Sequence, residues 1–427
     1  MKGEGKIPVI PSVLKNIPLR QYPWFLNIQF INLLLPLASY PYLLRVIGPE
    51  KYGLVAVSIA VGLAVTTITE YGISFTGVKD VSRMSDDSEK VSYYLSEVLL
   101  TRFIMLSGCC AILFIFFFSI PILKSEFLLF GLTVVGIFPN MLFPQWLYVG
   151  LQKIRRYNGI LFFNRALSVI FIFLLIKEES DYSIYPLVNL ISATVTAAVS
   201  FRSLRTIGIR LRPVPFNVVW NHMRHGFYPF ISQSLTLLYV QINPILLLAL
   251  IHDTALVGYY SLAEKIVVTS RNLTAPLNQL FLPGISKKFA VSIKQALHDV
   301  TQFAAIVGVV NILLVAALDI FAGYIVLIVA GEEYWQAALT VRILSPIILF
   351  ISLNNLAGVH VLLNLDLKKE FFIGIAAGVV VNLFLLLLLF PYASFNSPAV
   401  SWTVSEAVVL GVFILYIKKY RESGIDD

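Results

Sequence analysis

Ionisable residues interrupt a few of the long apolar runs of this 427-residue chain. The basic ones are Arg165, Lys265 and Arg271, with Arg45 and Arg342 nearer the ends of their runs, and the acidic ones are Glu70, Glu264 and Glu406. A charge inside a hydrocarbon layer is costly unless it faces a cavity or a partner, so each of these residues is a functional candidate. Arg binds phosphate through a bidentate fork and Lys binds it as a point charge. Because the basic candidates outnumber the acidic ones, the set favours a substrate that carries phosphate or diphosphate over an organic cation.

The segment 255–285 has the widest polar sector of any apolar run. Two neighbouring stripes of this predicted helix, about 100° apart, carry polar residues. One stripe holds Glu264, Val268, Arg271, Ala275 and Asn278. The other holds Lys265, Thr269, Asn272, Pro276 and Gln279. A lipid-facing surface would not tolerate this sector, so the helix is predicted to line a water-filled cavity, with Asn272 as a further substrate contact. The alternative is a buried Glu264–Arg271 ion pair that holds helices together.

Four charged residues lie close to the ends of their apolar runs: Glu97, Arg102, Asp319 and Arg342. Long side chains near a span end reach the headgroups, so an interfacial role is expected for these four, while Arg342 also stays a candidate near the outer face. Glu70, Glu264 and Glu406 are candidates for coupling transport to an ion gradient.

The elements that position these residues are helices inside a membrane. The chain is 58% hydrophobic and only 13% charged, whereas soluble domains are about a quarter charged. Several charge-free runs exceed the ~20 residues that a helix needs to cross a bilayer. We predict an all-α polytopic membrane protein with twelve spans, at 22–45, 54–78, 95–120, 127–150, 157–176, 183–202, 226–250, 255–285, 300–320, 336–363, 371–391 and 398–417.

The Lys and Arg residues define the sidedness of these spans. They gather at both termini and in alternate connections, above all in the linker 202–224, whereas the other connections hold few. Positive residues stay cytoplasmic, so both termini are predicted inside, in the cytoplasmic (inner) membrane. The net charge of +8 is explained by this pattern and not by nucleic acid. The basic, amphipathic run Asn217–His225 is predicted to lie on the anionic inner leaflet.

Weak internal similarity suggests a duplicated unit. Residues 131–139 match 338–346 at an offset of 207, with a proline at the end of each, and Tyr52-Gly53-Leu54 lies opposite Val257-Gly258-Tyr259 at an offset of 205. Because six spans is an even number, the halves would share one orientation, as in parallel-repeat transporters. We predict two six-helix bundles, 1–212 and 213–427, around a central cavity.

Several function classes are disfavoured by what the sequence lacks. The outer connections are short and no catalytic constellation is evident, which argues against an enzyme. There is no Walker-type glycine loop, and no metal site or cofactor is predicted. A transporter or a lipid-handling protein remains.

Five stretches carry a family resemblance: LLLPLASYPYLLRVIGPEKYGL at 33–54, PQWLYVGLQ at 144–152, VGYYSLAEK at 257–265, FLPGIS at 281–286 and GEEY at 331–334. The sequence resembles the bacterial O-antigen and polysaccharide flippases of the multidrug/oligosaccharidyl-lipid/polysaccharide exporter superfamily. The resemblance implies alternating access and movement of an undecaprenyl-diphosphate-linked oligosaccharide to the outer leaflet. It also implies contact with membrane lipids and with other polysaccharide-assembly proteins. The alternative is a cation-coupled multidrug antiporter, which the lack of a carboxylate between Gln21 and Leu44 disfavours.

Overall fold

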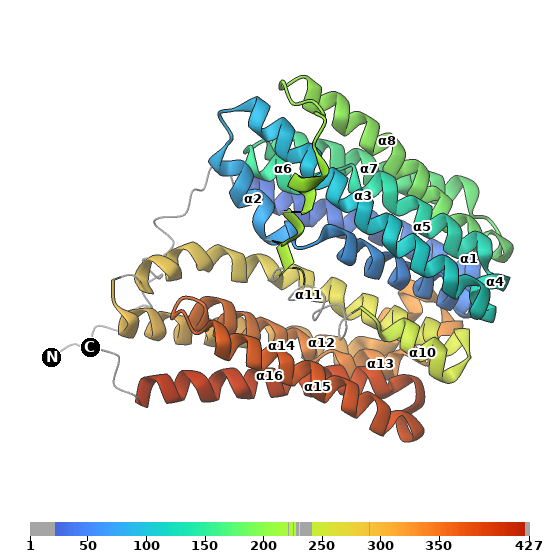
Figure 1. The fold of residues 1–427 in the computed structure, drawn as a ribbon. Helices are drawn as coiled ribbons and strands as arrows, with labels where there is room; N and C mark the ends of the chain where they lie inside the picture. Colours follow the sequence, from blue (N-terminus) through green and yellow to red (C-terminus); the bar gives the residue numbers. More distant parts are fainter. Residues whose placement is uncertain are drawn as a thin grey trace. The chain divides into compact units, whose positions relative to one another are not determined.

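The computed structural model describes residues 22–220, 222–224, 226–227, 230, 241–289 and 291–422. Within these ranges the regular secondary structure is entirely helical (Figure 1). Packing divides the chain into two compact units, one formed by Phe30–Leu262 with Val326–Ala337, and the other mainly by Ala263–Ile325 with Ala338–Asp427. The predicted all-α fold is confirmed.

The first unit holds most of α1 (Tyr22–Glu70), together with α2 (Ile73–Arg83), α3 (Ser88–Ser119), α4 (Pro121–Ser125), α5 (Phe127–Met141), α6 (Gln145–Gly150), α7 (Ile154–Leu175), α8 (Tyr185–Arg205) and α10 (Asn243–Ile251). Helix α8 packs against both α5 and α7, and α2 packs against α6. Leu129, Leu147 and Val188 are fully buried in this unit. The packing of α7 against α8 fixes the orientation of the polar face of α7.

The second unit contains most of α11 (Thr254–Phe289) and α12 (Ile293–Ala330), followed by α13 (Ala337–Leu344), α14 (Ile347–Asn354), α15 (Lys368–Ala393) and α16 (Ser397–Glu422). A π-helix, Asn355–Leu362, continues α14. Helices α15 and α16 pack along each other, and α14 packs on α16. Trp402 and Phe413 of α16 are buried in the core.

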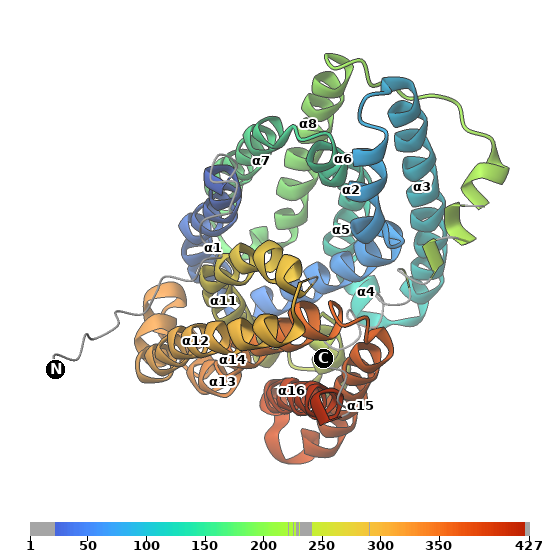
Figure 2. The ribbon, with the colours of Figure 1, turned by 90° about the vertical axis from the view of Figure 1, so that its left-hand side faces the viewer.

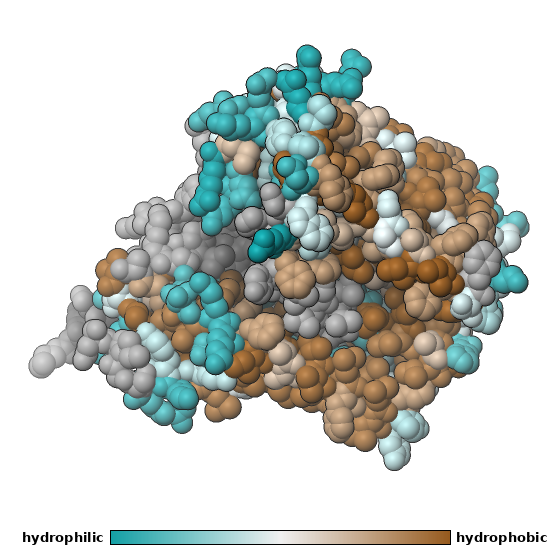
Figure 3. All heavy atoms as spheres, in the orientation of Figure 1, coloured by the Kyte–Doolittle hydropathy of each residue, from teal (hydrophilic) through white to brown (hydrophobic). Residues whose placement is uncertain are grey.

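Eight helical stretches of the described chain are long and apolar enough to cross a membrane. They are Ser39–Glu70, Ser88–Phe117, Phe127–Gly150, Ile154–Leu175, Glu179–Arg205, Ile293–Ala330, Ala337–Leu362 and Lys368–Glu422. The last one comprises two helices, α15 and α16. Apolar side chains cover the exposed flanks of the helices, and hydrophilic ones gather toward helix ends (Figure 3). A polytopic membrane protein is therefore supported, while residues 231–240, within the predicted seventh span, lie outside the described residues.

The connection between the first two predicted spans is shorter than expected. Helix α1 continues from residue 22 to residue 70, and only Gly48 departs from helical dihedrals, with φ 68° and ψ 171°. Glycine adopts this region without steric cost, and Pro49 then restarts a helix. The second predicted span is also wrong at its end: the helix stops at Glu70, because Tyr71 and Gly72 have φ values of 45° and 75°.

The predicted single helices 127–150 and 336–363 are each broken. Helix α5 ends at Met141 and α6 begins at Gln145, while α13 ends at Leu344 and α14 begins at Ile347. Pro144 and Pro346 lie in these breaks, directly before α6 and α14, while Pro139, the residue that matches Pro346 at offset 207, lies in the last turn of α5. Proline has no backbone N–H and clashes with the preceding turn. Hydropathy alone does not detect such breaks, since the residues on both sides are equally apolar.

Candidate functional site

The predicted basic residues are divided between the two units. Arg165 lies on α7 in the first unit, and Lys265, Arg271 and Asn272 lie on α11 in the second. A shared chamber for these residues therefore stays a prediction.

Arg165 belongs to a polar face of α7. It is half-buried, and its charge acts on the hydroxyl of Tyr157. Asn158, seven residues earlier and therefore on the same side of the helix, is 5% exposed. On the adjoining position, Asn164 Nδ2 donates to Thr196 Oγ1 of α8 at 2.7 Å. The first unit thus holds a cation and several amide or hydroxyl groups along one helix.

On α11, which begins at Thr254, the side chains of the polar sector are described from Glu264 to Asn272. Lys265 is exposed, and Glu264, Arg271 and Asn272 are half-buried. The side chains of Ala275, Pro276, Asn278 and Gln279 lie outside the described residues. The part that is described holds two cations, a carboxylate and an amide within about two turns. The water-filled cavity beside these residues stays a prediction.

Arg45 contacts a helix end. Its Nη2 donates to the carbonyl of Ile328 at 2.5 Å and to that of Leu327 at 3.5 Å, in the last turn of α12. Cations stabilise the unpaired carbonyls at helix C-termini. Close by, the Tyr334 hydroxyl donates to the Leu44 carbonyl at 3.3 Å. The observed role of Arg45 is therefore to join α1 to α12, and substrate binding by Arg45 stays a prediction.

Two repeat-related glycines meet next to this contact. A Cβ on Gly53 would overlap the carbonyl oxygen of Thr254, and a Cβ on Gly258 would overlap that of Pro49. Gly258 follows Gly53 by 205 positions, and Thr254 follows Pro49 by the same 205. The contact is therefore reciprocal, like a twofold interface between identical surfaces. We call Pro49, Gly53, Thr254 and Gly258 the glycine seam. Small residues of this kind let helix backbones approach closely in membranes.

Arg102 is the clearest correction to the sequence-based expectation. It does not reach the headgroups: it is 6% exposed, and its Nη1 donates to the carbonyl of Met141 at 3.0 Å. That carbonyl ends α5 where the helix is broken, and the carboxylate of Glu70 lies close enough to attract the guanidinium. The broken helix supplies an unpaired acceptor that the sequence does not reveal.

Arg342 and Asp319 connect α13 with α12. Arg342 Nε donates to the Asp319 carbonyl at 3.1 Å, and Ser345 Oγ donates to Asp319 Oδ1 at 2.7 Å. Ser345 lies in the break between α13 and α14. Charged residues therefore satisfy polar groups at both broken helices, α5–α6 and α13–α14.

Glu406 of α16 is buried, at 4% exposed, and is held by neutral donors. Asn354 Nδ2 donates to Glu406 Oε2 at 2.7 Å, and Trp402 Nε1 donates to Oε1 at 3.1 Å. The π-helix starts directly after Asn354, and such irregular turns are frequent at functional sites. The four-residue spacing of Trp402 and Glu406 is visible in the sequence, whereas the contribution of Asn354 required the fold.

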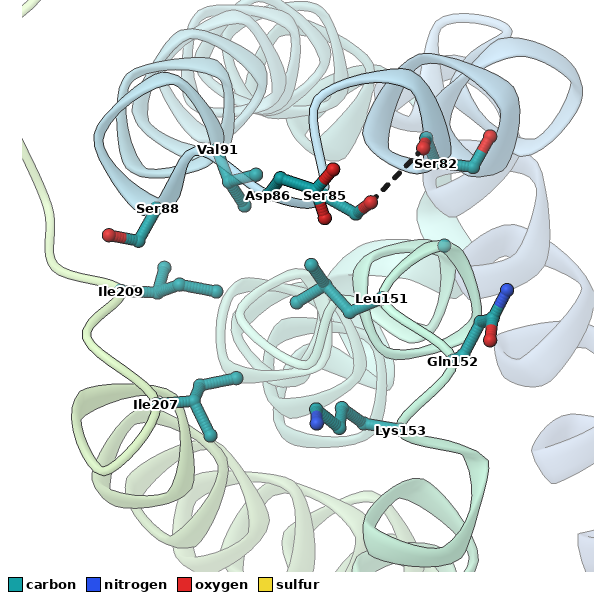
Figure 4. Close-up of a pocket in the computed structure, with 11 residues that line it drawn as sticks. Ser82, Ser85, Asp86, Ser88, Val91, Leu151, Gln152, Lys153, Ile207 and Ile209 are labelled. Carbon is teal, nitrogen blue, oxygen red and sulfur yellow. Dashed lines mark hydrogen bonds between the residues drawn. The ribbon is translucent and has the colours of Figure 1, made fainter.

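A polar and an apolar cavity lie among the described residues of the first unit. The polar one, about 540 Å³, is bordered by the α2–α3 connection, including Ser82, Ser85 and Asp86, and on its other side by Leu151–Lys153, Ile207 and Ile209 (Figure 4). At its edge Asp87 caps α3, and the backbone amide and side chain of Lys90 hold the pKa of that carboxyl below its usual range. The other cavity, about 550 Å³, is an apolar groove between α3, α5 and α8. Neither cavity contains a predicted site residue.

A family model described as polysaccharide biosynthesis protein matches residues 19–289, more than half of the sequence. The chain belongs to this family.

Curated relatives of this family member share most of its length. A protein of Escherichia coli (strain K12) named "Putative O-antigen transporter" is 26% identical over 415 residues, covering 92% of this chain and 95% of the relative. A Shigella dysenteriae protein of the same name is 23% identical over 316 residues, covering 71% and 75%.

Solved structures with the same fold include two transporters of different kinds. The lipid II flippase MurJ in an inward closed conformation has a TM-score of 0.69 and 15% identity, covering 93% of this chain and 87% of that one. An inward-facing multidrug resistance transporter of the MATE family has a TM-score of 0.69 and 12% identity, covering 91% and 95%. At these identities the likeness concerns the fold.

Proposed function

We propose that this member of the polysaccharide biosynthesis family moves an undecaprenyl-diphosphate-linked oligosaccharide, the repeat unit of O-antigen or another surface polysaccharide, from the inner to the outer leaflet. The observation that carries the proposal is the relationship to the E. coli protein named as an O-antigen transporter, which extends over 92% of the chain. The fold that the chain shares with a lipid II flippase is consistent with a lipid-linked sugar as substrate. No bond of the substrate is changed, so the protein is not an enzyme.

The proposed architecture has twelve spans in two parallel six-helix bundles, 1–212 and 213–427, around a central cavity. Two features support duplication: the broken helices beside Pro139 and Pro346, and the reciprocal glycine seam. The alternating basic connections support a place in the cytoplasmic membrane with both termini inside.

In the proposed mechanism the isoprenoid tail stays in lipid while diphosphate and sugars enter the cavity. Arg165 of one bundle, with Lys265, Arg271 and Asn272 of the other, would hold the diphosphate. Alternating access would then release it outward, with Arg45 and Arg342 near the outer end of the path. The glycine seam would be the contact that separates when the proposed cavity opens toward the outside.

Glu70, Glu264 and Glu406 are the proposed carriers of ion coupling. The carboxylate of Glu70 lies near the guanidinium of the buried Arg102. Glu406 is 4% exposed and accepts N–H donors from Asn354 and Trp402. The burial of Glu406 and its contact with Asn354, directly before the π-helix, support Glu406 as the residue whose protonation changes during the cycle.

The experiment is a leaflet assay with the purified protein in liposomes. A short-chain polyprenyl-diphosphate oligosaccharide with a fluorescent sugar is placed in both leaflets, and a membrane-impermeant reductant bleaches the outer population. Full bleaching with the protein and half bleaching without it supports flipping. Because the chain also shares the fold of a MATE transporter, the same liposomes are tested for efflux of a cationic dye. Dye efflux without movement of the lipid-linked sugar would establish the antiporter instead.

A further inference from the structure

The linker that follows α8 runs along the outside of α3 (Figure 2). The backbone amide of Arg210 donates to Ser92 Oγ at 3.1 Å, and that of Arg212 donates to Ser96 Oγ at 2.8 Å. Two residues of extended chain advance about 6.7 Å, and four residues of helix advance about 6.0 Å. The two spacings match, so alternate linker amides meet serines one helical turn apart.

After this extended part the linker becomes helical at 216–220, 222–224 and 226–227, and one side of this helix is held on α3. Val219 is fully buried, and His222 Nδ1 lies 2.9 Å from Glu97 Oε1. The imidazole of His222 also lies near the ring of Tyr94, with centroids 6.0 Å apart. The orientation of the helix about its own axis is thereby fixed.

The opposite side of the same helix is aromatic and exposed. Phe216, Trp220 and Phe227 are 65%, 60% and 49% exposed, and at 3.6 residues per turn their directions fall within about 40° of one another. Arg224 is exposed in the adjoining direction, and Arg210 and Arg212 are exposed in the extended part beside Leu211, which is 56% exposed. We call these seven residues the linker face: Arg210, Leu211, Arg212, Phe216, Trp220, Arg224 and Phe227.

The charges of the linker face define what it can bind. Its three ionisable residues are all arginines. Arg212 pairs with Glu89 at 2.9 Å, but both side chains are at least half exposed, and such surface pairs contribute little. The guanidinium is therefore available to a second anion. Aromatic rings flanked by cations fit the boundary between headgroups and acyl chains.

We infer that the linker face is a docking surface for anionic phospholipid of the cytoplasmic leaflet. Phe216, Trp220 and Phe227 enter the upper acyl region, and the arginines bind lipid phosphates. Because the other side of the linker is fixed to α3 by Ser92, Ser96 and Glu97, lipid bound here is attached to the first unit. The inference uses the proposed cytoplasmic position of the linker and is independent of the transported substrate.

Lipid-specific quenching tests this inference on the full chain. Cys109 and Cys110 are replaced by alanine, Trp220→Cys is labelled with a fluorophore, and the protein is placed in nanodiscs containing acyl-brominated phosphatidylglycerol or acyl-brominated phosphatidylcholine at equal fractions. We expect quenching by both lipids, stronger by about twofold with phosphatidylglycerol at low salt and equalised at high salt. A label at Phe114→Cys, an exposed mid-span position of α3, should be quenched equally by the two lipids.

The arginines are tested together as Arg210→Gln, Arg212→Gln and Arg224→Gln, with Arg83→Gln as an exposed control on α2. The triple variant should lose the preference for phosphatidylglycerol and the control should keep it. As a second measurement with Trp220 intact, phosphatidylglycerol should raise the melting temperature of the wild type more than that of the triple variant. Equal quenching by the two lipids in the wild type, or no quenching by either, would overturn the proposal, the latter in favour of water or a protein partner. Lipid movement is not the readout, so the result is separate from the flipping assay.

Discussion

Arg102 shows how the structure accommodates a charge inside an apolar helix without a substrate. Its guanidinium binds the carbonyl of Met141 and lies in the field of Glu70. The two groups belong to the same compact unit, so their interaction contributes to folding and does not require the transport cycle. The same reading applies to Arg45 at the end of α12.

Arg102→Ala should destabilise the first unit by roughly 3–5 kcal/mol, because it leaves buried acceptors and a carboxylate without their cation. Reversible unfolding in mixed micelles measures this change. Arg83→Ala, at an exposed position of α2, should stay within about 0.5 kcal/mol of the wild type. In the double variant Arg102→Ala/Glu70→Ala part of the stability should return, since the lone carboxylate is gone. If the double variant is less stable than Arg102→Ala by the full cost of Glu70→Ala alone, the two residues do not interact.

Glu406→Gln should remove the dependence of flipping on an imposed pH gradient, because glutamine cannot exchange a proton. Asn354→Ala is the matched control: it removes the 2.7 Å donor but keeps the carboxylate. Both variants should lose about 1–3 kcal/mol of stability through broken buried hydrogen bonds. Only Glu406→Gln should lose the gradient response in liposomes. An unchanged response in Glu406→Gln would exclude this residue as the proton carrier.

At the scale of elements, the glycine seam and the two broken helices are the main findings. The seam depends on backbone contact at Gly53 and Gly258, where no side chain fits. At the break between α5 and α6 the carbonyl of Met141 accepts from Arg102, and at the break between α13 and α14 the hydroxyl of Ser345 donates to Asp319. Discontinuous helices at corresponding places in two halves are a frequent mark of transport sites.

Gly53→Ala and Gly258→Ala should each open the seam, since the added methyl overlaps a backbone oxygen and overpacking costs about 1–3 kcal/mol. Ser58→Cys, buried one turn inward from the seam, reports the opening in a background with Cys109 and Cys110 replaced by alanine. An impermeant thiol reagent added outside the cell should label it faster in both glycine variants. Gly131→Ala, whose Cβ meets no atom within 4 Å, should leave labelling unchanged. Equal labelling in all variants would show that the seam does not limit outer access.

At the scale of the whole molecule, the proposed substrate cavity depends on residues from both compact units. Arg165 is in one unit, and Lys265 and Arg271 are in the other. A diphosphate held by both groups would connect the units through the substrate. Non-additive effects of mutations in the two groups would therefore test whether both groups bind the same substrate.

Arg165→Ala and the pair Lys265→Ala/Arg271→Ala should each lower the flipping rate at least about tenfold, which corresponds to the loss of one charge-assisted contact. The triple variant should lose less than the product of the two effects, because contacts to one ligand are coupled. The liposome assay described above measures the rates, with Arg83→Ala as control. Wild-type rates in the Lys265/Arg271 variant at equal protein amount would remove α11 from the substrate site.

The sequence by itself determined the membrane class, the helical fold and the location of the polar sector on α11. These properties depend on the free energy of transferring each side chain from water to lipid. The contributions of neighbouring residues add along the chain. The apolar run 127–150 and the charged position of Lys265 can therefore be recognised from the sequence without knowledge of the fold. The family resemblance of 33–54 and 257–265 added the substrate class, which the family model over residues 19–289 supports.

Only the tertiary structure decided which groups satisfy one another. Met141 lies 39 positions from Arg102, Glu97 lies 125 from His222, and Gly53 lies 205 from Gly258. Their contacts depend on how helices break, turn and pack, and apolar helices of similar composition give no local signal for this. The break after Pro139 is the clearest example: hydropathy is continuous across it, yet the missing backbone hydrogen bonds determine where Arg102 binds.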